Sequence, residues 1–459
     1  MTVDLLLKGG HVMTEGGLVR ADLAISGEKI VGLVAPGDIL SARRVVDVSG
    51  LHVLPGLIDT HSHHREPGFT HKEDILTATR ACAAGGVTVS VAMPNVSPPP
   101  TTAERLRDMF ALYEEKAIVD YNVNPAATVL EEIPKMAEMG ILAFKVFMVV
   151  DTGRSYPHMP GIGVHDHGEL FRIFQTVART HRPLMVHPHD QELMNAIEQS
   201  YWAQGRRDFR AYAEAYAAYD GIIWDTAVAL LLRLQEATNV RLHLLHVHTR
   251  RSIEMIRAAK AEGRSVSAEV NPWALWLGNE WETIERLGSY ALSYYVPPPH
   301  AEAVWKAVVD GTIDVLATDH APHTREEKEP GWIDGWKAHT GTPSAQYYLS
   351  LLLTEVARGR LSLERAVQLT ATQPAKLFGL YPKKGAIRVG ADADLVIVDL
   401  TAEATITNES VLSKCGWTPY AGRTVRGLPI HTLVRGRFVF EEGRVVGEPG
   451  YGRLARPVS

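Results

Sequence analysis

A regular alternation of short apolar runs with helical patterns, between residues 51 and 380, constrains the fold of this chain more than any other feature. The apolar runs are rich in β-branched residues and predict strands over residues 87–91, 143–147, 184–186, 242–245 and 315–317. Helical patterns fall between them, such as residues 251–262, which Gly263 closes at a position suited to a C-cap. Alternating βα units of this total length predict a parallel sheet, and a closed (β/α)8 barrel fits best.

An open, doubly wound parallel sheet is the alternative architecture for such a pattern. Sheets of that kind often carry a Gly-x-Gly-x-x-Gly loop directly after an early strand, where it binds a dinucleotide. No such loop follows an early strand in this sequence, and this favours the barrel.

Both ends of the chain have the pattern of short strands joined by tight turns. Near the start, residues 5–7, 21–25 and 30–33 predict strands, with turns expected at Gly9-Gly10 and at residues 26–29. Near the end, residues 393–398, 432–434 and 437–440 predict strands with glycine-rich turns between them. Two strand-rich ends that flank a long middle predict one small β domain built from both termini.

Composition excludes several classes of protein. Of the 459 residues, 46% are apolar and 22% are charged, which is ordinary for a soluble globular protein. A net charge of -6 and a pI of about 6.4 argue against a nucleic-acid partner. No run of about 18 apolar residues predicts a membrane span. The only cysteines, Cys82 and Cys415, exclude a disulfide scaffold, and no signal peptide is evident, so we expect reduced thiols in a cytoplasmic protein.

A His-x-His pair follows the apolar strand predicted at residues 54–58. Side chains alternate in direction along an extended chain, so His61 and His63 point the same way. A lone histidine here would more often have a structural role, whereas two imidazoles on one side of a strand end suit a metal ion. The pair therefore predicts metal ligands.

Four further polar side chains lie at the ends of apolar runs: Lys145, His187, His246 and Asp319. Barrel active sites lie at the C-terminal ends of the strands, so these residues are expected to meet the His-x-His pair. Burial within its strand disfavours the charge of Lys145. Two roles are open for this lysine: a salt-bridged side chain, or a carbamate, formed with CO2, that bridges two metal ions.

Taken together, these motifs resemble the cyclic amidohydrolases of the amidohydrolase superfamily: dihydroorotases, allantoinases and hydantoinases. The resemblance extends over nearly the whole chain and rests on residues 55–63, 85–88, 93–95, 144–148, 246–247, 318–323 and 374–380. It implies an α/β fold in which residues 51–384 form a TIM barrel and residues 1–50 with 385–459 form a composite β-sandwich domain. It also implies a homo-oligomer, either a dimer or a tetramer.

The resemblance implies a role for each residue at a strand end. His61 and His63 would hold one divalent metal ion, and His187 and His246 a second; we expect zinc in both places. Carboxylated Lys145 would bridge the two ions. Asp319 would bind the first ion and serve as general base and acid, because two cations lower the pKa of bound water and supply hydroxide at neutral pH.

The residues expected to contact substrate match no single branch of the family. Arg65 and Asn95 stand where dihydroorotases grip a substrate carboxylate, although a structural ion pair is the alternative for Arg65. Trp273 and His300 replace residues typical of relatives, and His323 follows the motif of Asp319. We expect substrate contacts from all five residues. For His189, His248, His300 and Trp273, packing or support of the metal ligands is an equal alternative. Residues 151–168 predict a loop and residues 200–223 an inserted helical element, and both segments are expected to contact either substrate or another subunit.

We expect a cyclic amidohydrolase that opens a cyclic ureide or imide at a ring C–N bond. A true dihydroorotase of pyrimidine biosynthesis is the nearest alternative. A non-catalytic dihydropyrimidinase-related structural protein is disfavoured because all six ligand positions are present. A deaminase or phosphotriesterase of the superfamily is disfavoured by the Gly-Gly-Val-Thr and Met-Pro-Asn segments.

Overall fold

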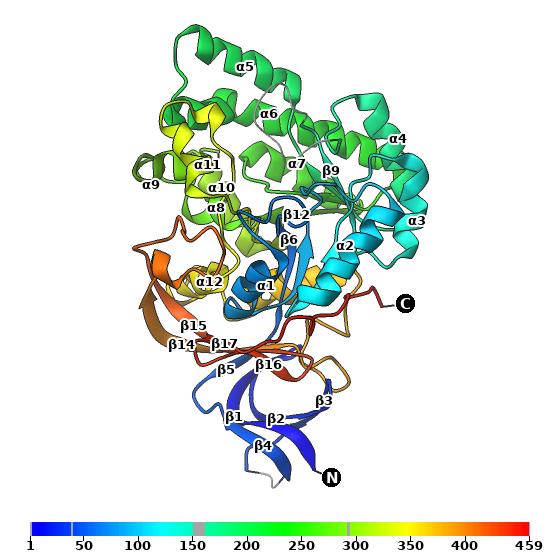
Figure 1. The fold of residues 1–459 in the computed structure, drawn as a ribbon, viewed down its shortest axis with the longest axis vertical. Helices are drawn as coiled ribbons and strands as arrows, with labels where there is room; N and C mark the ends of the chain where they lie inside the picture. Colours follow the sequence, from blue (N-terminus) through cyan, green and yellow to red (C-terminus); the bar gives the residue numbers. More distant parts are fainter. Residues whose placement is uncertain (1, 38–39, 150–160, 292–293, 459) are drawn as a thin grey trace.

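The computed structural model describes residues 2–37, 40–149, 161–291 and 294–458. Its upper part in Figure 1 is a barrel made of a three-stranded and a five-stranded parallel sheet. Parallel bridges between Ser62 and His320 and between Ala126 and Lys145 join the two sheets into a closed ring. The barrel strands are β6 (Leu57–Ser62), β7 (Val87–Ala92), β8 (Asp120–Val123), β9 (Phe144–Phe147), β10 (Leu184–His187), β11 (Leu242–Leu244), β12 (Val266–Val270) and β13 (Val315–Leu316).

Helices follow the barrel strands and surround the ring. Several begin at a side-chain cap: Asp74, Thr102, Asp166 and Asp190 each accept a hydrogen bond from the backbone N–H three residues on. The helices are α1 (Ile75–Ala84), α2 (Ala103–Lys116), α3 (Ile133–Glu138), α4 (His167–Ala178), α5 (Gln191–Ala203), α6 (Phe209–Thr238), α7 (Arg250–Ala261), α8 (Pro272–Trp276), α9 (Trp281–Leu287), α10 (Pro298–Asp310), α11 (Arg325–Lys328), α12 (Tyr348–Ala357), α13 (Leu363–Val367) and α14 (Gln373–Leu377).

Strands from both termini form one nine-stranded sheet below the barrel in Figure 1. Its order is β17-β16-β15-β14-β5-β1-β2-β3, with β4 paired to β1. The two ends of the chain meet where β5 and β14 run antiparallel. The strands are β1 (Val3–Thr14), β2 (Gly17–Ser26), β3 (Lys29–Val34), β4 (Ala42–Asp47), β5 (His52–Pro55), β14 (Leu395–Thr405), β15 (Thr424–Val434), β16 (Arg437–Glu441) and β17 (Arg444–Val445). The predicted union of the termini is confirmed.

The turn predicted at Gly9-Gly10 is wrong, because β1 continues through both glycines. The pairing of β1 with β2 shifts register between Leu7 and Gly10, which marks a β-bulge. Gly9 has a φ of 81°, and a Cβ there would lie 2.4 Å from Oγ of Ser49. The backbone N–H of Gly9 instead donates to Oδ1 of Asp22 at 2.7 Å, so the glycine serves a bulge within the strand.

The single strand predicted over residues 54–58 is also wrong, since it divides at Gly56 into β5 and β6. A Cβ at Gly56 would lie 2.3 Å from the side chain of Thr88, so only glycine fits where the chain passes from the terminal sheet into the barrel. The predicted domain limits stay a prediction. In the structure, β5 is paired within the terminal sheet.

The helical element predicted over residues 200–223 is present but belongs to two helices. It comprises the end of α5 and the first part of α6, which is kinked at residues 218–221 with left-handed backbone at Tyr219 and Asp220. Among the described helices, α6 is long and apolar enough to cross a membrane, but more than half of its most apolar stretch is buried inside the protein. Of the predicted loop at residues 151–168, residues 151–160 lie outside the described part of the chain, and α4 begins at His167.

Candidate metal centre and active site

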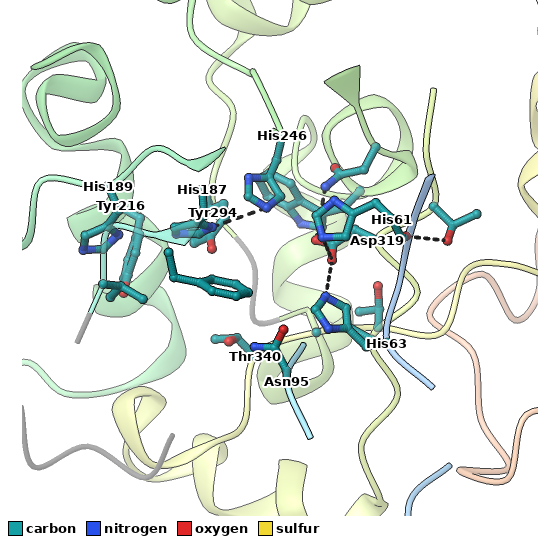
Figure 2. Close-up of a pocket in the computed structure, with 18 of the residues that line it drawn as sticks. His61, His63, Asn95, His187, His189, Tyr216, His246, Tyr294, Asp319 and Thr340 are labelled. Atoms are coloured by element: carbon teal, nitrogen blue, oxygen red, sulfur yellow. Dashed lines mark hydrogen bonds and ion pairs between the residues drawn. The ribbon is translucent and has the colours of Figure 1, made fainter. Parts of the chain in front are cut away.

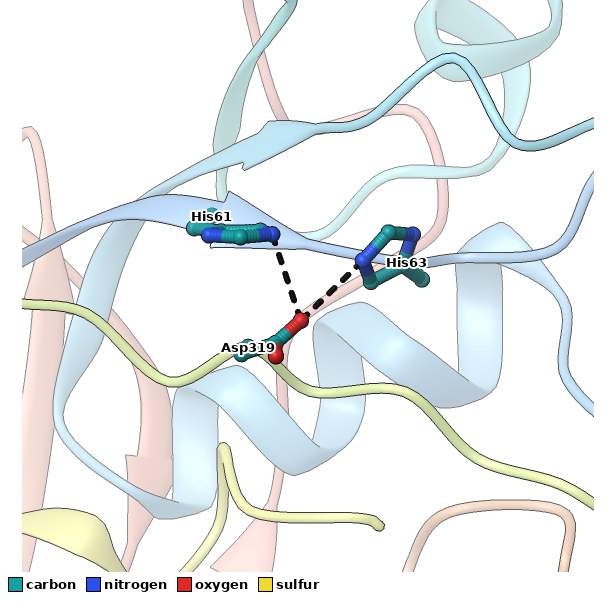
Figure 3. Close-up of side chains that lie close together, drawn as sticks. All are labelled: His61, His63 and Asp319. Atoms are coloured by element: carbon teal, nitrogen blue, oxygen red, sulfur yellow. Dashed lines mark hydrogen bonds and ion pairs between the residues drawn. The ribbon is translucent and has the colours of Figure 1, made fainter. Parts of the chain in front are cut away.

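Three of the predicted ligands converge at the C-terminal end of the barrel strands. His61 lies near the end of β6, His63 directly follows that strand, and Asp319 follows β13. Nε2 of His61 and Nε2 of His63 lie 3.2 and 3.1 Å from the same oxygen, Oδ1 of Asp319 (Figure 3). Their ligand atoms all lie within 4.8 Å of one another, which is close enough to surround one metal ion.

The second predicted pair lies beside this cluster. Nδ1 of His187, at the end of β10, is 3.3 Å from Nε2 of His246, just after β11. The rings of His246 and His61 are 5.3 Å apart between centroids, so the two groups of ligands adjoin (Figure 2). His246 and Asp319 have φ values of 40° and 43°, in the left-handed region that non-glycine residues rarely adopt. Strain of this kind is typical of functional sites.

Lys145 has the surroundings of a lysine that is neutral rather than salt-bridged. Its side chain is fully buried in β9, and its Nζ has no hydrogen-bond partner among the described residues. The Nζ lies 4.2 Å from the centroid of the Phe147 ring. Burial lowers the pKa of Lys145 to about 7, against the raising effect of Glu269 and Asp319. At neutral pH a large share of this amine is therefore unprotonated, which is the form that reacts with CO2.

Three of these histidines are held in the neutral form that binds metal. Burial is the main cause that lowers the pKa of His63 and of His187 well below the ordinary value, and that lowers the pKa of His246 to about 3. In the tautomer that donates Nδ1–H to Oε1 of Glu269, His61 directs the lone pair of Nε2 at Oδ1 of Asp319, and these two atoms repel each other unless a cation lies between them. The donor set thus fits divalent metal ions.

Glu269 of β12 supports this centre from behind and was not predicted from the sequence. Its Oε1 lies 2.5 Å from Nδ1 of His61, and its Oε2 lies 3.4 Å from Nε2 of His243. Burial alone would raise the pKa of Glu269, but His61 and His243 lower it below its ordinary value. The sequence feature that could have revealed it is a lone glutamate in the run Val266–Val270. This run was not predicted as a strand because serine and glutamate interrupt its apolar character.

A pocket of about 110 Å³ opens over the ligands, with Arg65, Asn95 and Trp273 in its walls. Arg65 is 1% exposed and has a φ of 62°. Its Nε donates to the carbonyl of Pro322 at 3.2 Å, and its Nη2 lies 3.0 Å from Nε2 of His323. Nη1 has no partner in the described part of the chain. Burial lowers the pKa of Arg65 to about 10, so it stays charged at neutral pH.

The other two predicted substrate contacts lie outside the pocket lining. Nδ1 of His300 accepts from the backbone N–H of Arg250 at 3.0 Å, at the start of α10. His323 lies behind Arg65, with its Nε2 also 2.8 Å from the carbonyl oxygen of Thr340. The positions of His300 and His323 therefore give no support to direct substrate contact.

The remaining pocket wall is aromatic and was only partly predicted. His189 reaches the pocket, whereas His248 lies behind it, with its ring 4.6 Å from that of Trp224. The labelled residues His189 and Tyr216 lie on the side of the view away from His63 and Asn95 (Figure 2). The following lining residues were not predicted from the sequence: Phe147, Val149, Tyr216, Asn271, Tyr294, Thr318, Ala321, Thr340, Gly341 and Thr342. Most of them lie in loops, and the ends of predicted strands do not indicate which loop residues reach the pocket.

Comparison with known proteins agrees with this geometry. Residues 52–439 match the model of the amidohydrolase family. The chain is 33% identical to an L-hydantoinase of Paenarthrobacter aurescens over 98% of its length and 97% of that protein. It is 34% identical to an allantoinase of Deinococcus radiodurans over 100% of both chains. It is also 34% identical to a dihydroorotase of Lactobacillus leichmannii, over 95% of this chain and 98% of that one.

Solved structures of relatives share the fold of this chain over nearly its whole length. A solved structure of L-hydantoinase (dihydropyrimidinase) from Arthrobacter aurescens covers 99% of this chain and 100% of its own, with a TM-score of 0.93 and 32% identity. A D-hydantoinase structure covers 99% of both chains with a TM-score of 0.90 and 29% identity. The predicted barrel with a terminal β-sandwich is confirmed. The chain belongs to the amidohydrolase family, within the group of cyclic amidohydrolases that includes hydantoinases, allantoinases and dihydroorotases.

Proposed function

We propose that the protein hydrolyses a ring C–N amide bond in a cyclic ureide or imide, giving an open-chain carbamoyl or amide acid. One observation carries this proposal: His61, His63 and Asp319 share a site with the His187–His246 pair and with buried Lys145 below a single pocket. This combination fits hydrolysis of an unactivated amide, a reaction that needs a strong nucleophile and a proton donor for the leaving nitrogen.

The donor set divides between two divalent ions, for which we infer zinc. His61, His63 and Asp319 would hold one, His187 and His246 the other, and the carbamate of Lys145 would bridge them. Bound ions would lower the pKa of water and polarise the scissile carbonyl. Glu269 holds His61 with Nε2 facing the site, because its carboxylate accepts the Nδ1 proton.

The protein's own residues would then move the proton and hold the ring. Asp319 takes a proton from the attacking water as the water oxygen bonds to the carbonyl carbon. It returns that proton to the ring nitrogen as the C–N bond breaks. Arg65, with Nη1 unpartnered among the described residues, and Asn95 would hold a carbonyl or an acidic substituent of the ring.

The test is a ring-opening screen with metal-loaded, purified enzyme. Hydantoin, dihydrouracil, allantoin, succinimide and dihydroorotate are each incubated with the protein, and the open-chain acids are quantified. The proposal expects at least one ring to be opened, with activity lost after chelation and restored by divalent metal. Absence of ring opening across the panel, by protein that holds its metals, would contradict it.

Dihydroorotase activity is the second candidate, and Arg65 is the observation that favours it. A buried, charged guanidinium in the pocket wall can bind a carboxylate such as that of dihydroorotate. Against it, position 300 holds a histidine outside the pocket lining rather than a second arginine. We therefore favour a neutral or differently substituted ring.

A further inference from the structure

Asn271 follows β12 and is the N-cap residue of α8, yet its side chain makes no capping hydrogen bond. An asparagine at this position ordinarily accepts from a backbone N–H in the first turn of the helix. Here Pro272 occupies the first turn, and the side chain of Asn271 lines the pocket instead. The side-chain amide of Asn271 therefore does not cap the helix.

The orientation of the amide follows from its neighbour. Nδ2 of Asn271 donates to Oδ2 of Asp319 at 3.3 Å. Because an ionised carboxylate only accepts hydrogen bonds, the nitrogen of the amide must face Asp319 and the carbonyl oxygen must face another way. This oxygen, Oδ1, is buried and has no hydrogen-bond partner among the residues that the structure describes, although the residue is only 3% exposed. A buried acceptor left in this state in the wall of a pocket is placed to accept from a donor that arrives with the ligand.

The two oxygens of Asp319 have different surroundings. Oδ1 faces Nε2 of both His61 and His63, whereas Oδ2 faces Asn271. Oδ1 would hold the metal ion together with the two histidines, which would leave Oδ2 to carry the transferred proton. The hydrogen bond from Asn271 uses one lone pair of Oδ2 and leaves the other for that proton. Asn271 thus adjoins the group that must protonate the leaving nitrogen.

We propose that Asn271 is a catalytic residue whose Oδ1 accepts a hydrogen bond from the N–H of the scissile ring amide. This inference rests on the proposed function. The contact holds the leaving nitrogen beside Oδ2 of Asp319. When the C–N bond breaks, its electron pair goes to nitrogen, the proton on Oδ2 passes to that nitrogen, and Asp319 returns to a carboxylate. The site therefore selects rings whose scissile nitrogen bears hydrogen over rings in which it is alkylated.

The experiment compares each ring with its N-methyl analogue at the scissile nitrogen: succinimide with N-methylsuccinimide, and hydantoin with 3-methylhydantoin. The ratio of kcat/KM for the N–H ring to that for the N-methyl ring is measured in wild type and in Asn271→Ala. We expect a ratio of about ten or more in wild type, the scale of one hydrogen bond plus the exclusion of a methyl group. In Asn271→Ala we expect a ratio within about threefold of one, mainly through slower turnover of the N–H ring.

Asn124→Ala is the matched control. Asn124 is also a fully buried asparagine with an unpartnered Oδ1 among the described residues, but its Nδ2 donates to the carbonyl of Thr60 and it lies outside the pocket lining. In Asn124→Ala, the ratio of kcat/KM for the N–H ring to that for the N-methyl ring should equal the wild-type ratio. Loss of stability would not change this ratio, because it lowers the amount of folded enzyme equally for both rings. Metal content is measured in every variant.

Three results would overturn the inference. An Asn271→Ala enzyme that is slower but keeps the wild-type ratio would show that Asn271 acts only on Asp319. Loss of metal from Asn271→Ala, with metal retained in Asn124→Ala, would assign the residue to the metal centre. Failure of metal-loaded wild type to open any ring would overturn the proposed function and this inference with it, whereas turnover with an unchanged ratio overturns this inference alone.

Discussion

Oε1 of Glu269 lies 2.5 Å from Nδ1 of His61, and both side chains are buried. The carboxylate accepts the Nδ1 proton, so the lone pair of His61 is on Nε2, the nitrogen that faces Asp319. A carboxylate that fixes the tautomer of a ligating histidine also makes that histidine a stronger ligand. The contact therefore links β12 to the proposed first metal ion.

Replacing this carboxylate should weaken metal binding. We expect Glu269→Gln to lower metal affinity by about 10–100-fold, the usual effect of losing such a partner. Competition with a chelator of known affinity measures the change. Glu355→Gln is the control, because Glu355 is a buried glutamate of α12 that pairs with Arg358 and Arg360 at the protein surface. Equal metal affinity in Glu269→Gln and wild type would contradict the assignment.

Carboxylation of Lys145 should depend on pH. Its pKa is lowered to about 7, so the neutral amine that reacts with CO2 is the minor form below pH 7 and the major form above it. Reconstitution of metal-free protein with zinc and bicarbonate should therefore be about tenfold faster at pH 8 than at pH 6 when dissolved CO2 is matched. The measurement is the rate at which activity returns.

Lys145→Ala supplies the control for that experiment. This variant should be inactive, and short carboxylic acids such as propionate should restore part of its activity by replacing the carbamate. An experimental structure with both metals present and electron density that ends at the Lys145 amine would exclude the carbamate.

Asp319→Asn should leave the protein folded and slow it severely. An amide cannot take up and return the proton, so we expect kcat to fall by about 10²–10⁴-fold, the usual contribution of acid–base catalysis. Metal content must be measured on the same sample, since Oδ1 of Asp319 also faces the metal ligands. A variant that keeps both metals and wild-type kcat would assign the proton transfer to another residue.

Dihydroorotate should be a poor substrate. One buried arginine contact with a carboxylate selects an anion by about ten- to a hundredfold, but position 300 holds a histidine outside the pocket lining instead of a second arginine. We expect kcat/KM for dihydroorotate to lie below that of a neutral ureide or imide. If dihydroorotate is instead preferred by a hundredfold and Arg65→Met removes the preference, the protein is a dihydroorotase with an altered carboxylate site.

The positions of the predicted metal ligands could be inferred from the sequence because each one lies at or near the C-terminal end of an apolar run. Barrel topology brings all strand ends to one face, so the positions of Lys145 and His187 along the chain were enough to predict that they meet. The barrel, the terminal sheet and the family are confirmed on this basis. The predicted homo-oligomer and cytoplasmic location stay predictions.

The missed parts have a common physical cause. Strands β8 and β12 carry buried polar residues, so neither has an apolar run. Glu269 was not predicted because its strand was not predicted. Asn271 precedes a proline at a helix start and has the pattern of an ordinary cap. His300 was expected in the pocket from its position in a motif, whereas the start of α10 directs it to Arg250. The directions of side chains in the loops that follow the strands could not be predicted from the sequence and were seen only in the structure.

The metal content of the protein is the most direct test of a two-metal centre. Elemental analysis of protein purified without chelator should find about two divalent ions per chain, with zinc predominant, as the six converging ligands require. Chelation should abolish ring opening, and activity should return as the second equivalent of metal is added. Less than one tightly bound ion per chain, in fully active protein never exposed to a chelator, would contradict the account.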